Sequence, residues 1–329
     1  LSKFDNLFVS NKPLLLHGHE RSITQIRYNA EGDLLFTASK DNTPNVWYTA
    51  NGERLGSFDG HNGDTTRLVT GSGDCKFCIW DCETGKCLIT IDAKTSVRSV
   101  LFSYSGKMVL YTTDAQMNLP AQINIIDITS GDHMILDSGS AQITMSDKNK
   151  IVSSLWTIGD EGFIAGHESG KISKWDLRQF TQPIMEIQPH TGQINDLQYN
   201  RDQTLFVSAS KDYTAKLFDP FTMDHLKTYV TDRPVNSAGI SPLFDHVALG
   251  GGQEAMEVTK TATESGKFET RFFHLIFEEE FARLKGHFGP IQSLAFHPDG
   301  KSFATGAEDG YIRLQSFDDS YFSFKLEYE

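Results

Sequence analysis

The stretch GHERSITQIRYNAEGDLLFTASKDNTPNVW, residues 18–47, decides the fold, because the spacing inside it returns at distant places in the chain. Its histidine and aspartate are 22 residues apart, Gly18 precedes the histidine, and Trp47 follows the aspartate by six residues. The same spacing occurs in three pairs, which are His19 and Asp41, His190 and Asp212, and His287 and Asp309. Near the other end, GHFGPIQSLAFHPDGKSFATGAEDGYIRLQ (residues 286–315) keeps this register, with Gln315 where tryptophan stood. A period of about 40 residues indicates a repeat architecture.

Glycine-histidine at one end of a repeat and tryptophan at the other is the WD-repeat signature of a β-propeller. At roughly 40–45 residues per blade, the chain accommodates seven blades and one long insertion. Apolar runs bounded by Gly, Asp and Asn are typical of half-buried antiparallel strands. In the first repeat they predict strands over residues 23–28, 34–39, 45–48 and 53–58. The third strands of the later repeats are predicted at 78–81, 123–127, 172–176, 215–219, 269–277 and 311–317. We therefore predict an all-β, seven-bladed WD-repeat β-propeller.

Two repeats depart from the pattern. In the second, His61 and Asp74 are 13 residues apart, nine short of the shared spacing. We interpret this as an absence of about nine residues between Gly63 and Asp64, with the numbering closed over them, because the missing stretch amounts to one inner strand. In the sixth repeat, polar residues with Gly and Thr follow VALGGGQEA and predict a long loop over residues 250–268.

The two ends of the chain are expected to meet in one sheet. The segment KPLLLHGH, residues 12–19, contains an outer strand without a blade of its own, and the seventh repeat has no matching outer strand. We therefore predict that Leu14–His17 pairs with the last blade, because closure removes open sheet edges. Residues 12–329 would then form a single propeller, preceded by an extra N-terminal segment of unassigned role at residues 1–11.

The charge balance and the cysteines bear on which ligands and which cellular compartment the protein suits. Lys and Arg number 30 against 43 Asp and Glu, for a net charge of −13, which disfavours a broad phosphate-binding surface. We expect no direct binding of nucleic acid. No run of 18 apolar residues predicts a membrane span, and the first residues lack the features of a secretory signal. All four cysteines fall within Cys75–Cys87, unlike a disulfide framework, so we expect a soluble protein of a reducing compartment.

Four residues of the first repeat, His19, Ser39, Asp41 and Trp47, imitate a Ser-His-Asp catalytic triad. We interpret them as a structural network in which the aspartate accepts from the histidine, the ring reaches the serine, and the serine contacts the indole. Partial copies occur at His190, Ser210 and Asp212, and at His287 and Asp309. A nucleophile would not need duplication in several blades, so we expect no catalytic residues and no enzymatic activity.

Three further motifs were weighed for other functions. In CKFCIWDCETGKC (residues 75–87), the odd spacing of Cys75 and Cys78 along a strand sends their side chains to opposite faces, whereas a zinc site needs a turn there. The glycines at 250–252 lack the Lys-Ser/Thr of a phosphate loop. We therefore expect no metal and no cofactor. The sequence WDLR at Trp175–Arg178 matches the short pattern with which some propellers dock onto cullin-type ubiquitin ligases, and a substrate receptor of such a ligase is the alternative function.

Several segments go beyond a generic repeat. LGGGQEAMEVT (residues 249–259) and GKFETRFFHLIFEEEFARLKGHFGPI (266–291) are demanded by no repeat consensus. Together with VWYTANGERLGSFDGH (46–61) and SASKDYTAKLFD (208–219), they closely resemble the family of subunit i of eukaryotic translation initiation factor 3. The resemblance covers the chain from Lys12 to its end.

This resemblance implies a non-catalytic scaffold in a large cytoplasmic complex. It implies binding to subunits b and g, through which the protein would support assembly of the small-ribosome preinitiation complex and messenger scanning. The family's contact to subunit b involves a leucine and an aspartate in the third strand of the fifth blade, which match Leu217 and Asp219 in AKLFDP. Contact with the small ribosomal subunit would be indirect, and no homo-oligomer is expected.

Overall fold

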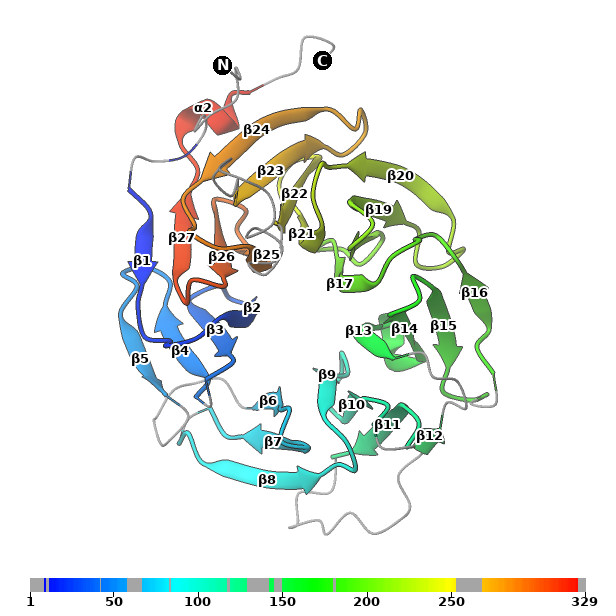
Figure 1. Cartoon of the computed structure of the whole chain (residues 1–329). Coiled ribbons are helices and arrows are strands. Elements are labelled where there is room, and N and C mark those ends of the chain that lie inside the picture. Colours follow the sequence, from blue (N-terminus) through cyan, green and yellow to red (C-terminus); the bar gives the residue numbers. More distant parts are fainter. Residues whose placement is uncertain are drawn as a thin grey trace, which may run out of the picture. The chain divides into compact units, whose positions relative to one another are not determined.

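Antiparallel strands make up most of the structure, which is a computed structural model. It describes residues 9, 12–41, 43–57, 67–82, 84–116, 119–128, 142–144, 150–179, 182–252 and 268–324. The strands of these residues, β1 to β27, form six four-stranded sheets and one three-stranded sheet, and Figure 1 labels most of them. The chain is therefore an all-β, seven-bladed β-propeller, and the predicted fold class is confirmed.

The described residues belong to two compact units, which are treated separately below. Unit 1 comprises the described residues of Leu1–Ser57, Gln198–Phe218 and Leu226–Glu329, and unit 2 comprises those of Phe58–Leu197 and Asp219–His225.

Blades 1, 6 and 7 lie in unit 1. Blade 1 has the strand order β2 (Ile23–Tyr28), β3 (Leu34–Ser39), β4 (Asn45–Tyr48) and β5 (Arg54–Ser57). Blade 6 consists of β21 (Val235–Ile240), β22 (His246–Gly251), β23 (Glu269–His274) and β24 (Glu280–Lys285). Blade 7 consists of β25 (Ile291–Phe296), β26 (Ser302–Ala307), β27 (Ile312–Ser316) and β1 (Leu14–Leu16).

Blades 2, 3 and 4 lie in unit 2. Blade 2 consists of β6 (Leu68–Gly71), β7 (Lys76–Trp80) and β8 (Cys87–Asp92), and blade 3 of β9 (Val97–Phe102), β10 (Met108–Thr113), β11 (Gln122–Asp127) and β12 (Gln142–Thr144). Blade 4 consists of β13 (Ile151–Trp156), β14 (Gly162–His167), β15 (Ile172–Asp176) and β16 (Met185–Ile187).

Blade 5 contains residues of both units. It has the order β17 (Ile194–Tyr199), β18 (Phe206–Ser210), β19 (Thr214–Phe218) and β20 (His225–Val230).

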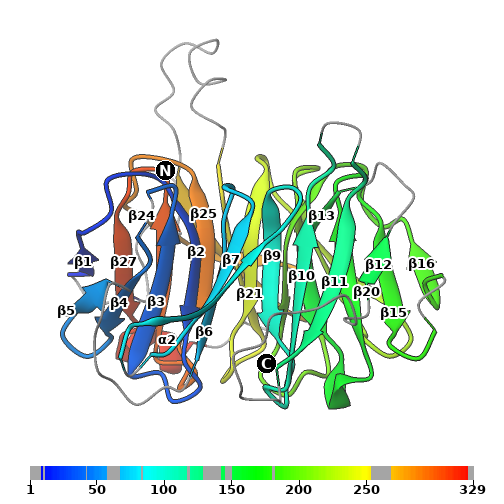
Figure 2. The same ribbon diagram turned by 90° about the horizontal axis from the view of Figure 1, so that it is seen from below.

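The strands of blade 1 follow the predicted pattern, and Figure 2 shows β2, β3 and β4 side by side. Leu35 of β3 lies opposite Trp47 of β4, and both side chains are buried. Residues directly opposite each other in paired strands point to the same face of the sheet. The predicted turn between β2 and β3 is closed by Asn29, whose Oδ1 accepts from the backbone nitrogens of Gly32 (2.9 Å) and Leu34 (3.1 Å). Gly32 has a φ of 85°, a conformation that glycine adopts without steric cost.

The N-terminal strand belongs to the last blade. Leu14 pairs with Leu314, and Leu16 with Ile312, so β1 is the outer strand beside β27. Val9 adds a bridge to Phe317 beyond the end of that strand. The predicted pairing of the N-terminal strand with the seventh blade is therefore confirmed.

Blade 2 has three strands in the described residues, β6, β7 and β8. The junction of Gly63 and Asp64, where the sequence predicts about nine missing residues, lies outside the described residues, and that interpretation stays a prediction. Most of the predicted loop over residues 250–268 also lies outside them.

Serine hydroxyls connect neighbouring inner strands within each unit. In unit 1, Ser237 Oγ accepts from the backbone nitrogen of Leu294 (3.1 Å), and Ser293 Oγ accepts from that of Ile26 (3.0 Å). In unit 2, Ser153 Oγ accepts in the same way from Leu197 (3.1 Å). Each bond satisfies an inner-strand N–H that has no backbone partner on the side of the next blade. These bonds fix how each inner strand lies against the next.

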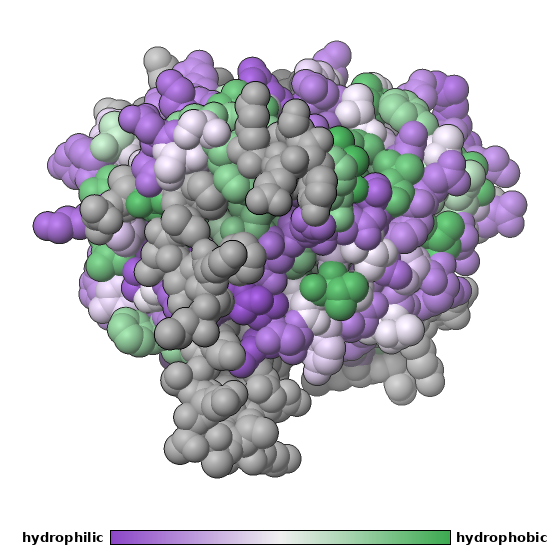
Figure 3. All heavy atoms as spheres, turned by 90° about the horizontal axis from the view of Figure 1, so that it is seen from above, coloured by the Kyte–Doolittle hydropathy of each residue, from purple (hydrophilic) through white to green (hydrophobic). Residues whose placement is uncertain are grey.

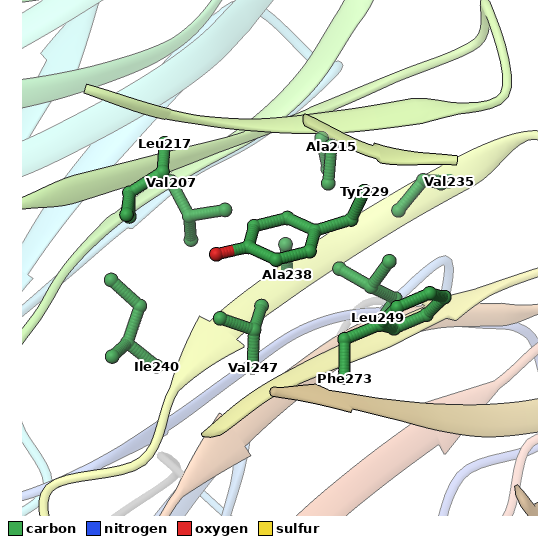
Figure 4. Close-up of a cluster of buried hydrophobic side chains, with 11 residues drawn as sticks. Val207, Ala215, Leu217, Tyr229, Val235, Ala238, Ile240, Val247, Leu249 and Phe273 are labelled. Carbon is green, nitrogen blue, oxygen red and sulfur yellow. The ribbon is translucent and has the colours of Figure 1, made fainter. Parts of the chain in front are cut away.

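The apolar cores lie between sheets. A cluster in unit 1 surrounds Tyr229, whose hydroxyl donates to the backbone oxygen of Leu275 over 2.8 Å (Figure 4). A cluster in unit 2 contains Phe163 and Trp175, with parallel rings 6.0 Å apart. Helices in the described residues are short, namely η1 (Ile158–Asp160) and α2 (Asp319–Phe322). No helix there has the length and apolar character needed to cross a membrane.

Candidate functional site

A buried polar network joins the loop before β2 to the strands of blade 1. Nδ1 of His19 lies 2.8 Å from Oδ2 of Asp41, and Nε2 lies 2.8 Å from Oγ1 of Thr37. The indole nitrogen of Trp47 donates to the same hydroxyl over 3.0 Å. Asp41 also accepts from the backbone nitrogen of Glu20 at 3.1 Å. The network therefore satisfies buried polar groups from three segments of one blade.

Burial lowers the pKa of His19 below its ordinary value of 6.5, and the bond to Asp41 offsets this effect only in part. For Asp41, burial acts to raise the pKa, but hydrogen bonds from His19 and from the backbone nitrogens of Thr43 and Glu20 together outweigh it and lower the pKa. At neutral pH the network therefore pairs a neutral imidazole with a carboxylate, so Nδ1 donates to the carboxylate and Nε2 accepts from the hydroxyl. The hydroxyl of Thr37 is hydrogen-bonded to both the imidazole and the indole, so it is not available as a nucleophile for a substrate.

The hydroxyl of this network belongs to Thr37, and the sequence-based choice of Ser39 needs correction. Ser39 Oγ donates to the backbone oxygen of Arg21 (3.0 Å) and accepts from the backbone nitrogen of Asp41 (3.2 Å). Residues 37 and 39 share a face of β3, but Thr37 lies one step further into the sheet and so comes within reach of Trp47 on β4. Ser39 therefore shapes the turn, and Thr37 joins the histidine to the tryptophan.

Blade 7 repeats the histidine part of the network. His287 Nδ1 lies 3.2 Å from Oδ2 of Asp309, and Nε2 lies 2.8 Å from Oγ1 of Thr305. Burial lowers the pKa of His287, against the opposing effect of Asp309. Gln315 stands where blade 1 has tryptophan, and its buried Oε1 has no hydrogen-bond partner among the described residues.

Blades 2 and 5 keep other parts of the pattern. In blade 2, the Trp80 indole donates to Thr70 Oγ1 over 2.8 Å. In blade 5, the backbone nitrogen of Asp212 donates to Ser210 Oγ (3.2 Å), which repeats the turn bond between Asp41 and Ser39. His190 is buried in unit 2.

The motifs weighed for metal and ligase binding lie in blades 2 and 4. All four cysteines are free thiols, and no group of three or more His, Cys, Asp or Glu in the described residues could hold a metal ion. The Trp175 side chain is buried and donates to Ser173 Oγ over 2.9 Å, while Arg178 is exposed and lies 3.1 Å from Glu161. The tryptophan of the WDLR motif is thus part of the blade 4 core, which leaves the arginine for contact with a ligase.

The two residues that the resemblance assigns to partner binding differ in accessibility. Leu217 of β19 is 1% exposed and packs in the core cluster of unit 1 with Val207 and Tyr229 (Figure 4). The Leu217 side chain is too buried to contact a partner directly, so it can affect binding only through the packing of its strand. Asp219, which follows β19 and lies in unit 2, is half-buried and opens the turn 219–224.

The Asp219 side chain organises this turn, which we call the 219–224 turn. Its Oδ1 accepts from the backbone nitrogens of Phe221 (2.7 Å) and Thr222 (3.3 Å). Its backbone nitrogen donates to Asp224 O (3.1 Å), and its backbone oxygen accepts from Met223 N (2.9 Å). Met223 is buried and has a φ of 60°, a region that residues other than glycine seldom adopt. The bonds to Asp219 therefore hold an unfavourable backbone conformation in place.

Lys174 of β15 reaches the 219–224 turn from blade 4 within unit 2. Its ammonium donates to the backbone oxygens of Pro220 (2.8 Å) and Phe221 (3.0 Å) and lies 5.9 Å from the centre of the Phe221 ring. Burial lowers the pKa of Lys174, and the nearby charge of Asp219 opposes this effect. The sequence contained no signal for this contact, because it joins two repeats through a side chain and two carbonyls.

Exposed apolar side chains lie on the turn and beside Lys174, which contacts it. Phe221 is 60% exposed. Met185 at the start of β16 and Ile184 just before it lie beside Lys174 and are 39% and 54% exposed. On the face drawn in Figure 3, hydrophobic residues occur in small groups among hydrophilic ones. An acidic turn with apolar neighbours is suited to a partner segment that carries both basic and apolar side chains.

Seven antiparallel sheets with this repeated network define a WD-repeat propeller, a class of rigid sheet scaffold that presents loops to other molecules. The family model of EIF3I matches residues 11–327. The chain is 53% identical to eukaryotic translation initiation factor 3 subunit I of Bombyx mori (96% of this chain and 99% of that protein), and 54% identical to that of Anopheles gambiae (96% and 100%). It is 55% identical to the corresponding subunit of Drosophila mojavensis, over 94% of this chain and 98% of that protein. The chain belongs to the family of eukaryotic translation initiation factor 3 subunit I and is a component of a translation initiation factor.

Proposed function

We propose that the protein is a non-catalytic cytoplasmic scaffold that holds subunits b and g within initiation factor 3. Through these subunits it would support assembly of the small-ribosome preinitiation complex and messenger scanning, without binding RNA itself. Membership of the family and the names of the relatives support the first part of this proposal. The propeller supports the second, because loops on rigid sheets can bind partners without refolding of the scaffold.

The observation that carries the contact with subunit b is the arrangement of charges at the 219–224 turn. Both hydrogen bonds from the turn to the Asp219 carboxylate use Oδ1, which leaves Oδ2 for an external donor. The ammonium of Lys174 is bound by two carbonyls of the same turn and does not form the ion pair with Asp219. An arginine or lysine of subunit b can therefore pair with Asp219 while an apolar neighbour contacts Phe221.

Leu217 has a supporting role in this proposal. Its side chain fills the core beneath β19, so its loss would disturb the strand that leads into the 219–224 turn. The net charge of −13 favours encounter with basic partner segments and raises the association rate more than the affinity. Binding to subunits b and g as a single copy requires no homo-oligomer.

Asp219→Lys tests the contact with subunit b. Reversal of the charge should raise the Kd for purified subunit b at least about tenfold, since a close charge pair becomes a repulsion. Asp92→Lys, which makes the same charge change at an exposed position of β8, is the matched control and should bind normally. Equal binding by folded Asp219→Lys and by the control would remove Asp219 from the interface.

Capture of the tagged protein from cytoplasmic extract tests the wider proposal. We expect initiation-factor subunits, with b and g among them, to be recovered. Recovery of a cullin adaptor without those subunits would instead favour the ligase alternative at Trp175–Arg178. No observation in the structure favours that alternative.

A further inference from the structure

We propose that Lys174 is a positioning residue, which holds the 219–224 turn in the conformation that binds the partner. This inference rests on the proposed contact between Asp219 and subunit b and adds a residue from another blade to it. Lys174 would not touch the partner's basic group. It would act through the backbone of the turn.

The hydrogen bonds of Lys174 differ from those of an ordinary surface lysine and fit a positioning role. Its ammonium donates to two successive carbonyls, those of Pro220 and Phe221, at 2.8 and 3.0 Å. Hydrogen bonds from a charged donor are stronger than neutral ones, and two such bonds fix both the position and the direction of the acceptors. The ring of Phe221, 5.9 Å away, adds a favourable cation–π contact. The turn is thus held at its apex.

The strand that carries Lys174 is held on both sides. Lys174 lies in the middle of β15, where it pairs with Ile164 of β14 on one side and with Met185 of β16 on the other. A residue held by backbone hydrogen bonds on both sides has little freedom to move. The lysine therefore connects the 219–224 turn to a three-strand stretch of sheet.

The turn depends on the hydrogen bonds from Lys174 for two reasons. Met223 adopts a positive φ, which costs on the order of 1 kcal/mol for a residue other than glycine and persists only where surrounding contacts impose it. Pro220 has no backbone N–H, so its carbonyl is its only backbone hydrogen-bonding group, and Lys174 binds that carbonyl. Without the ammonium, the turn would keep the hydrogen bonds made within the turn itself but would lose its anchor to β15.

The sign of one measurement separates this proposal from simple electrostatics. Lys174 is a positive charge close to Asp219, so its removal makes the site more acidic. If only charge mattered, Lys174→Met would bind a basic partner more tightly. If the lysine positions the turn, the same variant must bind more weakly, because the partner then meets a turn that has to be reordered.

The experiment compares the Kd of purified subunit b for Lys174→Met, Lys174→Arg and Lys171→Met. We expect Lys174→Met to weaken binding about tenfold, as for loss of a charge-assisted hydrogen bond. Lys174→Arg, which keeps a charged donor, should recover part of this loss. Lys171→Met, which removes a lysine paired with Glu186 at 3.6 Å in the same blade, should bind normally. Unchanged or tighter binding by folded Lys174→Met would overturn the inference.

Two further measurements keep it distinct from the proposed function. In the isolated protein, amide hydrogen exchange across residues 221–224 should become at least several-fold faster in Lys174→Met, and equal exchange would overturn the inference whatever the partner does. A double-mutant cycle with Asp219→Asn should give non-additive losses, because both residues act on one turn, whereas additive losses would contradict it. If Asp219→Lys binds normally, the proposed function fails even where the exchange result stands, and the partner-binding role of Lys174 falls with it.

Discussion

The indole nitrogen of Trp47 lies 3.0 Å from the hydroxyl oxygen of Thr37, and that hydroxyl also lies 2.8 Å from His19. One threonine therefore serves as acceptor for a tryptophan and as donor for a neutral histidine. Both neighbours are buried, so neither can turn to water if the threonine is lost. The residue that joins two strands of blade 1 is thus a small side chain outside the four that the sequence singled out.

Thr37→Val should destabilise the protein markedly. The substitution keeps the shape of the side chain but leaves the buried indole N–H of Trp47 without its acceptor and removes the hydroxyl partner of His19 Nε2, which keeps only Asn45 Nδ2 at 3.1 Å; we expect a cost of about 2–3 kcal/mol in the free energy of unfolding. Urea unfolding measures this difference. Thr37→Ser, which keeps the hydroxyl, should lose much less, and Ser39→Ala should lose about 1 kcal/mol because only turn bonds are affected. A loss for Ser39→Ala equal to that of Thr37→Val would contradict the assignment.

The position of this hydroxyl could have been found in the sequence. A hydroxyl residue stands four positions before the aspartate in four repeats, at Thr37, Thr70, Ser208 and Thr305. The serine two positions before the aspartate is absent from the seventh repeat, where Ala307 replaces it. Comparison of all repeats therefore indicates the threonine, whereas the first repeat alone suggests a catalytic-looking serine. The strands and the closing pair of β1 and β27 were predictable because period and spacing carry them.

Other parts of the site were not predictable from local pattern. Lys174 reaches the 219–224 turn from a neighbouring repeat, and nothing in either segment encodes that approach. Leu217 is an apolar strand residue between half-buried Lys216 and buried Phe218, and its sequence context fits both a core role and a contact role. Only the packing around it, with Val207 and Tyr229, separates the two.

Leu217→Ala should act through stability. Truncation of a fully buried leucine removes apolar contacts and leaves a cavity, at a cost of about 2–5 kcal/mol in the free energy of unfolding. Leu226→Ala, at a leucine of β20 that is 45% exposed, is the matched control and should change stability by less than about 0.5 kcal/mol. Thermal and urea unfolding measure both. If Leu217→Ala kept full stability but bound subunit b less well, the leucine would have to contact the partner directly.

Stability should fall as the pH drops from 7 toward 5, partly because of His287. Burial lowers its pKa in the folded protein, so below about pH 6.5 the unfolded chain binds more protons at this site than the folded one. The free energy of unfolding therefore rises with pH across this window, and the contribution is lost as the pH falls toward the folded pKa. The pKa of Asp309 is also lowered, through hydrogen bonds from His287 and the backbone that exceed the effect of burial, so its own contribution is lost only near and below pH 4.

His287→Gln tests this dependence. Because the chain has ten other histidines, only the difference between the two proteins isolates one site. The variant should be less stable at pH 7.5, but its melting temperature should fall less than that of the unmodified protein between pH 7.5 and pH 5.5. The same fall in both proteins would show that protonation of His287 is not linked to unfolding.

Gly162→Ala should destabilise blade 4 severely. Gly162 begins β14 opposite Asp176, and a Cβ added there would lie 1.9 Å from the backbone oxygen of Trp175. Because the obstacle is the backbone of the paired strand β15, relief requires the two strands to separate there, and we expect a loss of more than about 3 kcal/mol in the free energy of unfolding. Gly73→Ala is the matched control in unit 2, since a Cβ there meets nothing within 4 Å and a more restricted unfolded chain should leave it neutral or about 0.5 kcal/mol more stable. Chemical denaturation of the two variants, read by the tryptophan fluorescence that Trp175 contributes, would contradict the close approach of β14 to β15 if Gly162→Ala unfolded at the same denaturant concentration as Gly73→Ala.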